Sequence, residues 1–438
     1  MLPKVKYKNY NEIIKNMQQK ICKYTNDIWI PSDKIKMKKV NTNSWFSLSE
    51  SFENKECDFI EHNYNTENLV IPTYKAKKIT LILNQTQKNI INNWLNIYAL
   101  MYNSSIKYIK NNVENDKNVL KFINLRKILK NEKKELIKNS NIKVHDIDGA
   151  IKLACTMYRS ALTNIKNCNI KKFRIRYWKK KKEIKIMDLE KQNFTKYGIR
   201  TNILGKIIGK YNGENFNFND IKCDCKLQKR NENYYLFVPE KIKTIQAEKP
   251  NKIISIDPGI RTFFTGITES KVIKIKDKKS IIKGYLKRKD KIMKNELISD
   301  KIKKKNEKMI NKKISNIVSD LHWKTIKYLT DNNEVILMGN MSTKNISKKE
   351  GNLNSMTKRI GLMMRLYEFK QRLRFKCGIN GTKFGEIDEW YTSKMCSKCG
   401  NIKDDLKGDK VYDCLKCKTK MDRDINGSRN IYMVAINK

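Results

Sequence analysis

The sequence predicts a multidomain α+β protein: a β-barrel-like domain interrupted by a helical block, followed by an α/β domain that carries a small inserted ribbon. Three observations support this fold class. Helical periodicity fills residues 85–168, and strand-like alternation lies on both sides of it. Short strands begin near residue 249 and are followed by alternating helices and strands. Two Cys-x-x-Cys pairs then mark a ribbon within 390–420.

Basic residues dominate the composition. The 438 residues include 94 lysines and arginines against 45 aspartates and glutamates, a formal net charge of +49. The chain is rich in lysine, asparagine and isoleucine throughout, and such a bias alone would raise the lysine count. It would not explain so large an excess of base over acid. We therefore expect a nucleic acid bound along an extended basic track.

Several other classes of protein are disfavoured. No stretch approaches the roughly 18 consecutive apolar residues of a membrane span, and the first residues lack the apolar segment of a signal peptide. The 11 cysteines are odd in number and mostly scattered, which is typical of a reducing compartment. The 3 histidines lie far apart in sequence, which disfavours a histidine–metal centre. We therefore expect an intracellular protein without a membrane partner.

The first half of the chain is divided by its periodicities. Residues 1–73 show no clear period, and their role cannot be assigned. Alternation over 78–83 predicts a strand. Asn84 and Gln87 then have the spacing of a helix capping box, with amphipathic helices behind it up to about residue 168.

Alternation with period two returns at 173–178. Phe173, Ile175 and Tyr177 form an apolar face, while the opposite face is basic and aromatic. Such a face suits the phosphates and bases of a nucleic acid, and an ordinary solvated sheet face is an equal alternative. A hairpin with strands at 221–227 and 234–238 follows. The candidate nucleic-acid-binding residues are Arg174, Arg176, Trp178, Lys179 and Lys180.

An α/β domain is predicted beyond residue 252. Its expected elements are strands at 253–256, 263–267 and 272–275, basic helices over 281–330, a strand at 335–338, a helix at 355–376, a strand at 383–388 and a helix at 426–436. A β-meander followed by alternating helices and strands, with an aspartate in the first strand, is the ribonuclease-H-like plan.

Four cysteines give the strongest local signal. Cys396 and Cys399 are separated by fourteen residues from a second pair, Cys414 and Cys417. Paired Cys-x-x-Cys turns place four thiolates around one Zn²⁺ ion, which is a more specific explanation than four unrelated thiols. A closed four-thiolate site has no open coordination position, so we expect a structural zinc.

Two aspartates flank this ribbon in the predicted domain. Asp257 ends an apolar strand before a Pro-Gly turn, and Asp424 begins the last helix within Asp-Arg-Asp. Each has an ordinary alternative role, as a turn residue and as a helix cap. Carboxylates gathered from distant elements are also what metal-dependent phosphodiester cleavage requires, because hard divalent cations prefer oxygen ligands.

In combination, these motifs resemble one known family. The ordered set is Ile256-Asp257-Pro-Gly, Asp320-Leu-His-Trp-Lys324, Tyr391-Thr-Ser-Lys-x-Cys-x-x-Cys-Gly and Asp422-Arg-Asp-Ile-Asn-Gly. It is similar to the RuvC nuclease of the TnpB/Fanzor family, transposon-encoded relatives of the single-protein CRISPR effectors that carry only a RuvC nuclease. The resemblance covers about 75–438 of the chain.

One position departs from the TnpB pattern. TnpB proteins have a catalytic glutamate at the end of the strand where this chain has Gly339. Fanzor proteins carry it on the neighbouring strand, just before Thr-Ser-x-x-Cys-x-x-Cys, and that position here is Glu389. Adjacent strands lie ~4.8 Å apart, so a carboxylate on one can fill the place vacated on the other. Glu386 and Asp388 stay open as alternatives, and the departure favours the Fanzor branch over an inactive enzyme.

The resemblance implies an RNA-guided DNA endonuclease. Asp257, Glu389 and Asp424 would be catalytic and would bind two Mg²⁺ ions. A guide (omega) RNA would select complementary double-stranded DNA next to a short flanking motif. One protein chain would act in each ribonucleoprotein, in the nucleus of a eukaryotic host or at a viral replication site. The implied domains are an extension at 1–73, a wedge-type β-barrel at 74–84 and 169–248, a helical recognition domain at 85–168, the RuvC domain at 249–389 and 421–438, and the zinc ribbon at 390–420.

Two alternatives are kept. Gly339 is also what a nuclease-dead, RNA-guided DNA-binding protein would show after losing its carboxylate. A zinc-ribbon DNA-binding transposase accessory that uses no RNA would explain the cysteines and the charge. Co-purified RNA separates this accessory from the guided proteins, and Mg²⁺-dependent cleavage separates an active nuclease from a dead one.

Overall fold

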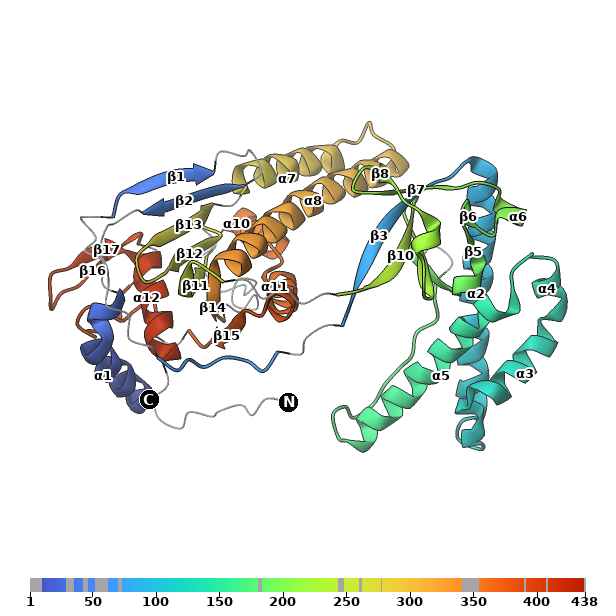
Figure 1. Ribbon diagram of the computed structural model, residues 1–438, viewed down its shortest axis with the longest axis horizontal. Coiled ribbons are helices and arrows are strands. Elements are labelled where there is room, and N and C mark those ends of the chain that lie inside the picture. The colour runs from blue at the N-terminus through green and yellow to red at the C-terminus, as the bar shows by residue number, and fades with distance from the viewer. Residues whose placement is uncertain are drawn as a thin grey trace. The chain divides into compact units, whose positions relative to one another are not determined.

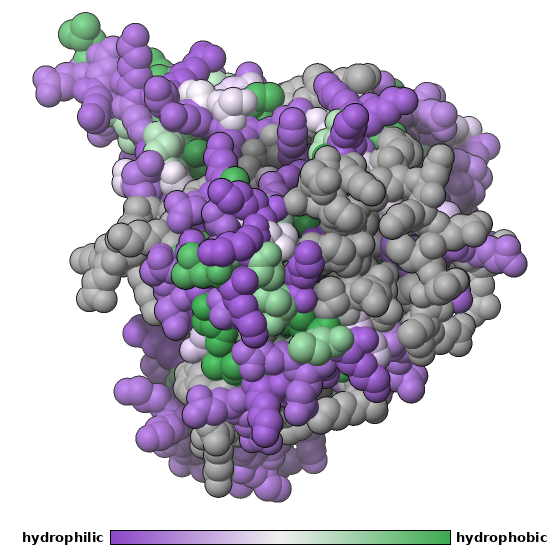
Figure 2. Space-filling view, turned by 90° about the vertical axis from the view of Figure 1, so that its left-hand side faces the viewer, coloured by the Kyte–Doolittle hydropathy of each residue, from purple (hydrophilic) through white to green (hydrophobic). Residues whose placement is uncertain are grey.

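The computed structural model describes residues 10–28, 35–41, 46–51, 62–69, 73–179, 183–242, 248–259, 262–276, 278–340, 354–389, 391–406 and 409–436. The chain divides into two compact units (Figure 1). Unit 1 comprises Met1–Pro72 and Lys243–Lys438, and unit 2 comprises Thr73–Ile242. The face drawn in Figure 2 is mostly hydrophilic, in keeping with the composition. Within the described residues, no helix has the length and apolar character that a membrane crossing requires.

Unit 2 contains an antiparallel six-stranded sheet in the order β4-β9-β10-β3-β7-β8. The predicted hairpin is confirmed by the pairing of β9 with β10, which are joined through Asn231 and Glu232. The described pairs run in one row from β4 to β8, so a closed barrel stays a prediction. The strands are β3 (Tyr74–Ile82), β4 (Ile184–Leu189), β7 (Ile208–Tyr211), β8 (Glu214–Asn215), β9 (Cys225–Arg230) and β10 (Asn233–Lys241), with a separate small hairpin of β5 (Phe194–Thr195) and β6 (Gly198–Ile199).

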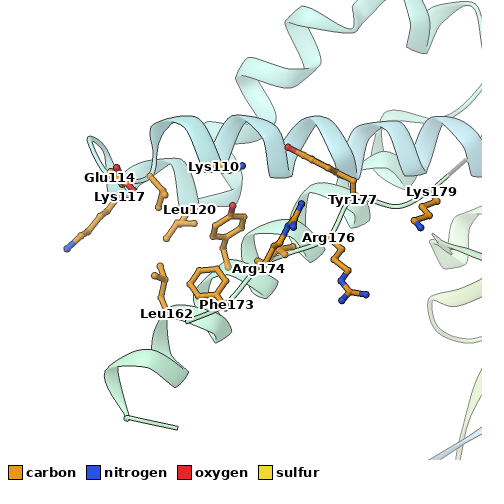
Figure 3. A pocket seen from close by; sticks show the side chains of 13 residues that line it. Lys110, Glu114, Lys117, Leu120, Leu162, Phe173, Arg174, Arg176, Tyr177 and Lys179 are labelled. Carbon is orange, nitrogen blue, oxygen red and sulfur yellow. The ribbon is translucent and has the colours of Figure 1, made fainter. Parts of the chain in front are cut away.

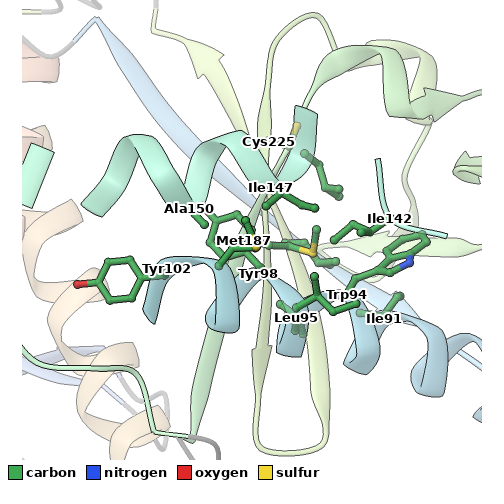
Figure 4. Close-up of a cluster of buried hydrophobic side chains, with 14 of the residues drawn as sticks. Ile91, Trp94, Leu95, Tyr98, Tyr102, Ile142, Ile147, Ala150, Met187 and Cys225 are labelled. Atoms are coloured by element: carbon green, nitrogen blue, oxygen red, sulfur yellow. The ribbon is translucent and has the colours of Figure 1, made fainter. Parts of the chain in front are cut away.

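Helices pack against this sheet through one apolar core. The capping box is confirmed: Gln87 donates its backbone N–H to Asn84 Oδ1 over 2.8 Å, and Asn84 N–H donates to Gln87 Oε1 over 2.9 Å. Figure 4 shows Trp94 and Tyr98 of α2 meeting Met187 of β4. The helices are α2 (Gln85–Asn112), α3 (Phe122–Glu132), α4 (Lys134–Lys138), α5 (Val144–Lys166) and α6 (Thr201–Leu204), with short 3₁₀ turns η2 (Lys117–Leu120), η3 (Lys191–Asn193) and η4 (Phe218–Asp220).

The strand expected at 173–178 is wrong. These residues are extended but pair with no other strand among the described residues. Asn103 of α2 instead binds both backbone groups of Trp178: its Nδ2 donates to the carbonyl over 3.0 Å, and its Oδ1 accepts from the N–H over 2.7 Å. The Trp178 ring stacks on Tyr102, with centroids 4.7 Å apart. At the end of the segment the expected faces are reversed. Tyr177, expected on the packed apolar face, is 49% exposed, and Trp178, expected on the exposed face, is packed.

Unit 1 is organised by a seven-stranded sheet in the order β1-β2-β13-β12-β11-β14-β15. β11 pairs antiparallel with β12, and β12 pairs antiparallel with β13, so the predicted meander is confirmed. On its other side β11 pairs parallel with β14. No strand was expected in 1–73, yet β1 and β2 lie there and extend the sheet next to β13. The strands are β1 (Met37–Asn41), β2 (Ser47–Ser51), β11 (Asn251–Pro258), β12 (Phe264–Ile267), β13 (Val272–Lys276), β14 (Asn333–Gly339) and β15 (Lys383–Ile387), with the ribbon hairpin β16 (Val411–Asp413) and β17 (Lys420–Asp422).

Alternation along β11 and β14 places helices on both faces of this sheet. Ile254, Ile256 and Ile336 pack with α7, α8, α10 and α11, whereas Ile253 and Leu337 pack with α1 and α12. Both expected long helical stretches are split, the second of them at Arg365, which has a left-handed φ of +48°. The helices are α1 (Tyr10–Ile28), α7 (Lys279–Lys294), α8 (Asp300–Asn332), α10 (Ser355–Met363), α11 (Leu366–Asn380) and α12 (Arg423–Ala435).

His322 is buried where α8 meets α11, and both of its ring nitrogens have partners. Nε2 lies 2.9 Å from the Met364 carbonyl oxygen, and Nδ1 lies 3.2 Å from Nη1 of Arg372. A carbonyl only accepts and a guanidinium only donates, so the neutral ring protonated on Nε2 satisfies both. Burial lowers the pKa of His322 to about 4.

A pH dependence of stability follows from this neutral histidine. Between about pH 6.5 and pH 4, His322 is protonated in the unfolded chain but stays neutral in the folded chain. The free energy of unfolding should therefore be about 2 kcal/mol lower at pH 5 than at pH 7 because of this one residue. Denaturant unfolding at pH 7 and pH 5 measures this loss. The loss should be smaller in His322→Gln, and an equal loss in both proteins would contradict the assignment.

Candidate functional site

Asp257 lies at the carboxyl edge of the sheet in unit 1. The parallel register of β11 and β14 ends at Ile256 opposite Met338, so Asp257 and Gly339 follow next to each other. Asp257 also pairs with Thr265 of β12. The aspartate is therefore held by β12 on one side, and on the other side it lies next to the end of β14.

Glu389 reaches the same place from two residues beyond the end of β15. Gly339 pairs with Ile387, the last residue of that strand. A Cβ atom placed on Gly339 would overlap the Glu389 Oε1 atom and would lie 2.9 Å from Cδ1 of Ile431. The carboxylate of Glu389 thus occupies the space that a side chain at position 339 would need.

Asp424 comes to the site on the first turn of α12. Asp422 caps this helix by accepting from the N–H of Asp424 over 2.9 Å, and Lys274 binds the other carboxylate oxygen of Asp422 over 2.6 Å. Close approach of α12 to β11 is possible because Gly427 faces the Asp257 carboxylate, where a Cβ would overlap it. Asp257 of β11 thus lies near both Asp424 of α12 and Glu389, which follows β15, since the charges of both act on the Asp257 carboxyl group.

The electrostatics of the site disfavour its negative charges. Burial, followed by Glu389 and Asp424, raises the pKa of Asp257 well above its usual range. Burial also raises the pKa of Glu389 to about 7, against the opposing effect of Lys370. The Oε1 atom of Glu389 is buried and has no hydrogen-bond partner among the described residues. A hard cation bound here would compensate the buried negative charges and would give the unpaired carboxylate oxygen a partner.

The three carboxylates are not drawn together as tightly as ligands around one ion. Among the described residues, only the four ribbon cysteines form a group of such side chains with all ligand atoms within 4.8 Å of one another. The role of the three carboxylates as metal ligands therefore stays a prediction.

The alternatives to Glu389 have other surroundings. Glu386 binds Lys370 over 2.7 Å and is also paired with Arg374, which binds Glu67 over 2.7 Å as well. Its charge is therefore already balanced by two cations. Asp388 is exposed. Of the three acids near the end of β15, only Glu389 is directed at Gly339.

The four cysteines meet the geometric requirement of a zinc site. Their sulfur atoms all lie within 4.8 Å of one another, with 3.7 Å between Cys396 and Cys417 and 3.5 Å between Cys399 and Cys414. A tetrahedral zinc with Zn–S bonds of about 2.3 Å requires sulfur separations of about 3.8 Å. The thiolates therefore fit a structural Zn²⁺.

Both cysteine pairs use the same turn. The residue after each second cysteine, Gly400 or Lys418, has a left-handed φ, of +71° and +55° respectively. Its N–H donates to the carbonyl of the first cysteine, over 2.9 Å for Cys396 and 3.0 Å for Cys414. The repeated turn explains why both pairs present their sulfurs to one centre.

The candidate nucleic-acid-binding residues belong to unit 2. Arg174, Arg176 and Lys179 lie along the extended segment 173–179, and Lys180 lies outside the described residues. Trp178 lines a second, neighbouring pocket, and its ring stacks on Tyr102. Sequence reasoning missed Lys110 and Lys117, which face the same segment, because no local pattern predicts that α2 and η2 lie beside it.

Comparisons with known proteins place the chain in a family. A family model described as Cas12f1-like, TNB domain, matches residues 367–431, which run from α11 through the ribbon into α12. TnpB-like protein L770 of Acanthamoeba polyphaga mimivirus is 30% identical over 476 residues, covering 98% of this chain and 89% of that protein. This chain belongs to the TnpB-like family.

Two further similarities of this TnpB-like chain are more limited. The CRISPR-associated endodeoxyribonuclease Cas12f1 of Sulfoacidibacillus thermotolerans is 36% identical over 73 residues, 16% of this chain and 17% of that protein. A solved complex of Cas12f1 with sgRNA and target DNA has a TM-score of 0.45 and 13% identity, covering 80% of this chain and 83% of that one.

Zinc removal gives a test of the ribbon in this TnpB-like protein. The wild type is expected to carry one tightly bound zinc per chain, and Cys414→Ser should lose it and lower the unfolding temperature, because a ligand of the closed site is missing. Elemental analysis of freshly purified protein measures the metal. Cys168→Ser, which changes an exposed thiol, is the control and should keep the zinc. Wild-type protein without zinc would rule the assignment out.

Proposed function

We propose that this protein is an RNA-guided DNA endonuclease of the Fanzor type, which cuts complementary double-stranded DNA beside a short flanking motif. One observation carries the proposal. The carboxylate of Glu389 enters from beyond β15 and takes the space above Gly339, next to the end of β11 where Asp257 lies. The glutamate that TnpB proteins carry on the strand of Gly339 would thus be replaced in space by one from the neighbouring strand.

Family membership and charge support the choice of substrate. One relative is named an endodeoxyribonuclease, and its similarity to this chain is 36% identity over 73 residues. The net charge of +49 suits two polyanions, a guide RNA and its DNA target. In the proposal the RNA supplies sequence specificity by base pairing, and the protein holds the heteroduplex through its backbone.

Asp257, Glu389 and Asp424 would hold two Mg²⁺ ions. When bound, the metal supplies an activated water and stabilises the leaving 3′ oxygen. The remaining work belongs to the chain. The pairing of β11 with β12 fixes Asp257, the cap at Asp422 fixes the first turn of α12, and the buried Oε1 of Glu389 is left for a cation. The ribbon zinc would have a structural role only.

Glu389→Gln is expected to abolish guided cleavage while leaving RNA and target binding intact. The amide keeps the shape but loses the charge that holds a cation, and metal stabilisation of several kcal/mol corresponds to a loss of at least about 100-fold in rate. Asp257→Ala and Asp424→Ala should behave in the same way. The measurement is cleavage of a matched plasmid with Mg²⁺, run beside a binding assay. Full activity in Glu389→Gln would refute the role of this glutamate.

The neighbouring acids supply matched controls. Asp388→Asn removes an exposed charge and should leave cleavage almost unchanged. Glu386→Gln leaves the cations of Lys370 and Arg374 without their full partner, so its main effect should be a lower unfolding temperature. Loss of cleavage in Asp388→Asn at unchanged stability would instead make Asp388 the ligand.

Gly339→Ala tests the close approach directly. The added methyl group needs the space of the Glu389 carboxylate, so cleavage should fall even though no charge is removed. The reduction should be partly relieved in Gly339→Glu combined with Glu389→Ala, which returns one carboxylate to the same space. Wild-type rates in Gly339→Ala would show that Glu389 is free to lie elsewhere.

The guide RNA requirement has its own experiment. Protein expressed with the DNA flanking its own gene should purify with a discrete RNA, which sequencing identifies. RNA-free protein that binds one duplex DNA equally tightly would favour a transposase accessory. Target binding with a matched RNA but no cleavage by the unmutated protein would favour a nuclease-dead binder.

A further inference from the structure

A cleft of about 840 Å³ lies in unit 2 between the ends of α2 and α5 and the extended segment 173–179 (Figure 3). Its opening is bordered by cations from three parts of the chain: α2, η2 and the segment. Its inner surface is formed by apolar and aromatic side chains of α5, η2 and the segment. The cleft therefore combines a cationic surface, which suits an anionic ligand, with an apolar surface, which suits a hydrophobic one.

The cations at the opening are not neutralised by the protein. Within the described part of the chain, none of them forms an ion pair, and Glu114 is the one carboxylate in the lining. Figure 3 shows them spread along the cleft, from Lys117 at one end to Lys179 at the other. A row of free cations fits a ligand with several phosphates better than a single anion. The five cations are Lys110, Lys117, Arg174, Arg176 and Lys179.

Aromatic and apolar groups lie between these cations. Tyr158 is buried at 7% exposure and meets the Phe173 ring edge to face, with centroids 5.8 Å apart. Leu162 and Tyr177 are 38% and 49% exposed. Burial of these surfaces requires a flat apolar group, and a nucleobase is the flat group that arrives with phosphates on both sides.

The wall that carries Tyr177 is held in place from behind. Asn103 binds the N–H and the carbonyl of Trp178, and the ring of Trp178 stacks on Tyr102 on the other side of the segment. These contacts fix the backbone next to Tyr177 without using any atom of the cleft. A prearranged stacking surface loses less entropy when a ligand binds.

We propose that this cleft binds an unpaired nucleotide of a single-stranded or bulged RNA, with its base against Tyr177 and its flanking phosphates on the five cations. A paired base would be stacked inside a duplex and could not enter the cleft. Glu114 lies at the Lys117 end of the cleft (Figure 3) and offers an acceptor for the 2′-hydroxyl of a neighbouring nucleotide in the same strand, a donor that DNA lacks. The inference rests on the proposed function, because the RNA concerned would be part of the guide.

The test uses the full-length protein and a short RNA hairpin with one bulged 4-thiouridine. The fully paired hairpin and the bulged DNA hairpin are the comparison probes. The ratio of bulged to paired affinity cancels the unspecific attraction of a basic protein. The bulged RNA is expected to bind more tightly than both, and irradiation should crosslink the 4-thiouridine to the peptide that contains Tyr177.

Two substitutions make the result specific to the cleft. Tyr177→Ala should lower the affinity for the bulged RNA by at least about fivefold, as expected for the loss of one stacked base. Tyr197→Ala is the matched control, since Tyr197 has the same 49% exposure in unit 2 but does not line the cleft. An unchanged preference in Tyr177→Ala, or crosslinks confined to other peptides, would overturn the proposal. Equal binding of the bulged DNA would overturn its restriction to RNA.

Cleavage of a matched plasmid by the same preparations separates this inference from the proposed function. Guided cleavage without a preference for the bulged RNA would refute the cleft alone. A preference for the bulged RNA, lost in Tyr177→Ala, together with no guided cleavage would refute the nuclease and leave the cleft assigned.

Discussion

The parallel pairing of β11 with β14 is the constraint on which the rest of unit 1 depends. It sets the ends of two adjacent strands side by side, so that Asp257 and Gly339, which has no side chain, lie next to each other at one edge of the sheet. β15 then pairs with β14, and its continuation brings Glu389 back over that edge. The same alternation that buries Ile254 on one face and Ile253 on the other decides where α12 can lie. The acids are thus positioned by the sheet, although only one of them lies within it.

The ribbon and the last helix are mechanically joined. Asn426 of α12 donates to the Met395 carbonyl over 2.8 Å and accepts from the Ser397 N–H over 2.9 Å, and Asn430 donates to the same carbonyl over 2.7 Å. These buried amides connect the first cysteine turn to α12, the helix whose first turn carries Asp424. A structural zinc in the ribbon would therefore also stabilise the N-terminal half of α12, where Asn426 and Asn430 lie.

Local patterns in the sequence predicted the local features well. The capping box at Asn84 and the meander of 253–275 depend on neighbours in sequence, and both were correct. The segment 173–179 was mispredicted because its partner, Asn103, comes from a helix 75 residues away. Periodicity could not separate Glu389 from Glu386 and Asp388, since their surroundings differ through residues distant in sequence, such as Lys370 and Arg374 of α11, which pair with Glu386. The strands in the N-terminal extension were missed because no clear period marks them and their place depends on distant pairing, of β2 with β13 and of β1 with β2.

The close contact at Gly339 has a consequence for how such a site changes over generations. A side chain at position 339 and the carboxylate of Glu389 need the same volume, so a chain bearing a glutamate at both positions would be overcrowded. A chain bearing neither would lack the acid altogether. Single substitutions that lead from one arrangement to the other therefore pass through a chain with both glutamates or a chain with neither, and both would be impaired if this acid is the metal ligand. A small residue at position 339 and an acid at position 389 are therefore expected to occur together in related proteins.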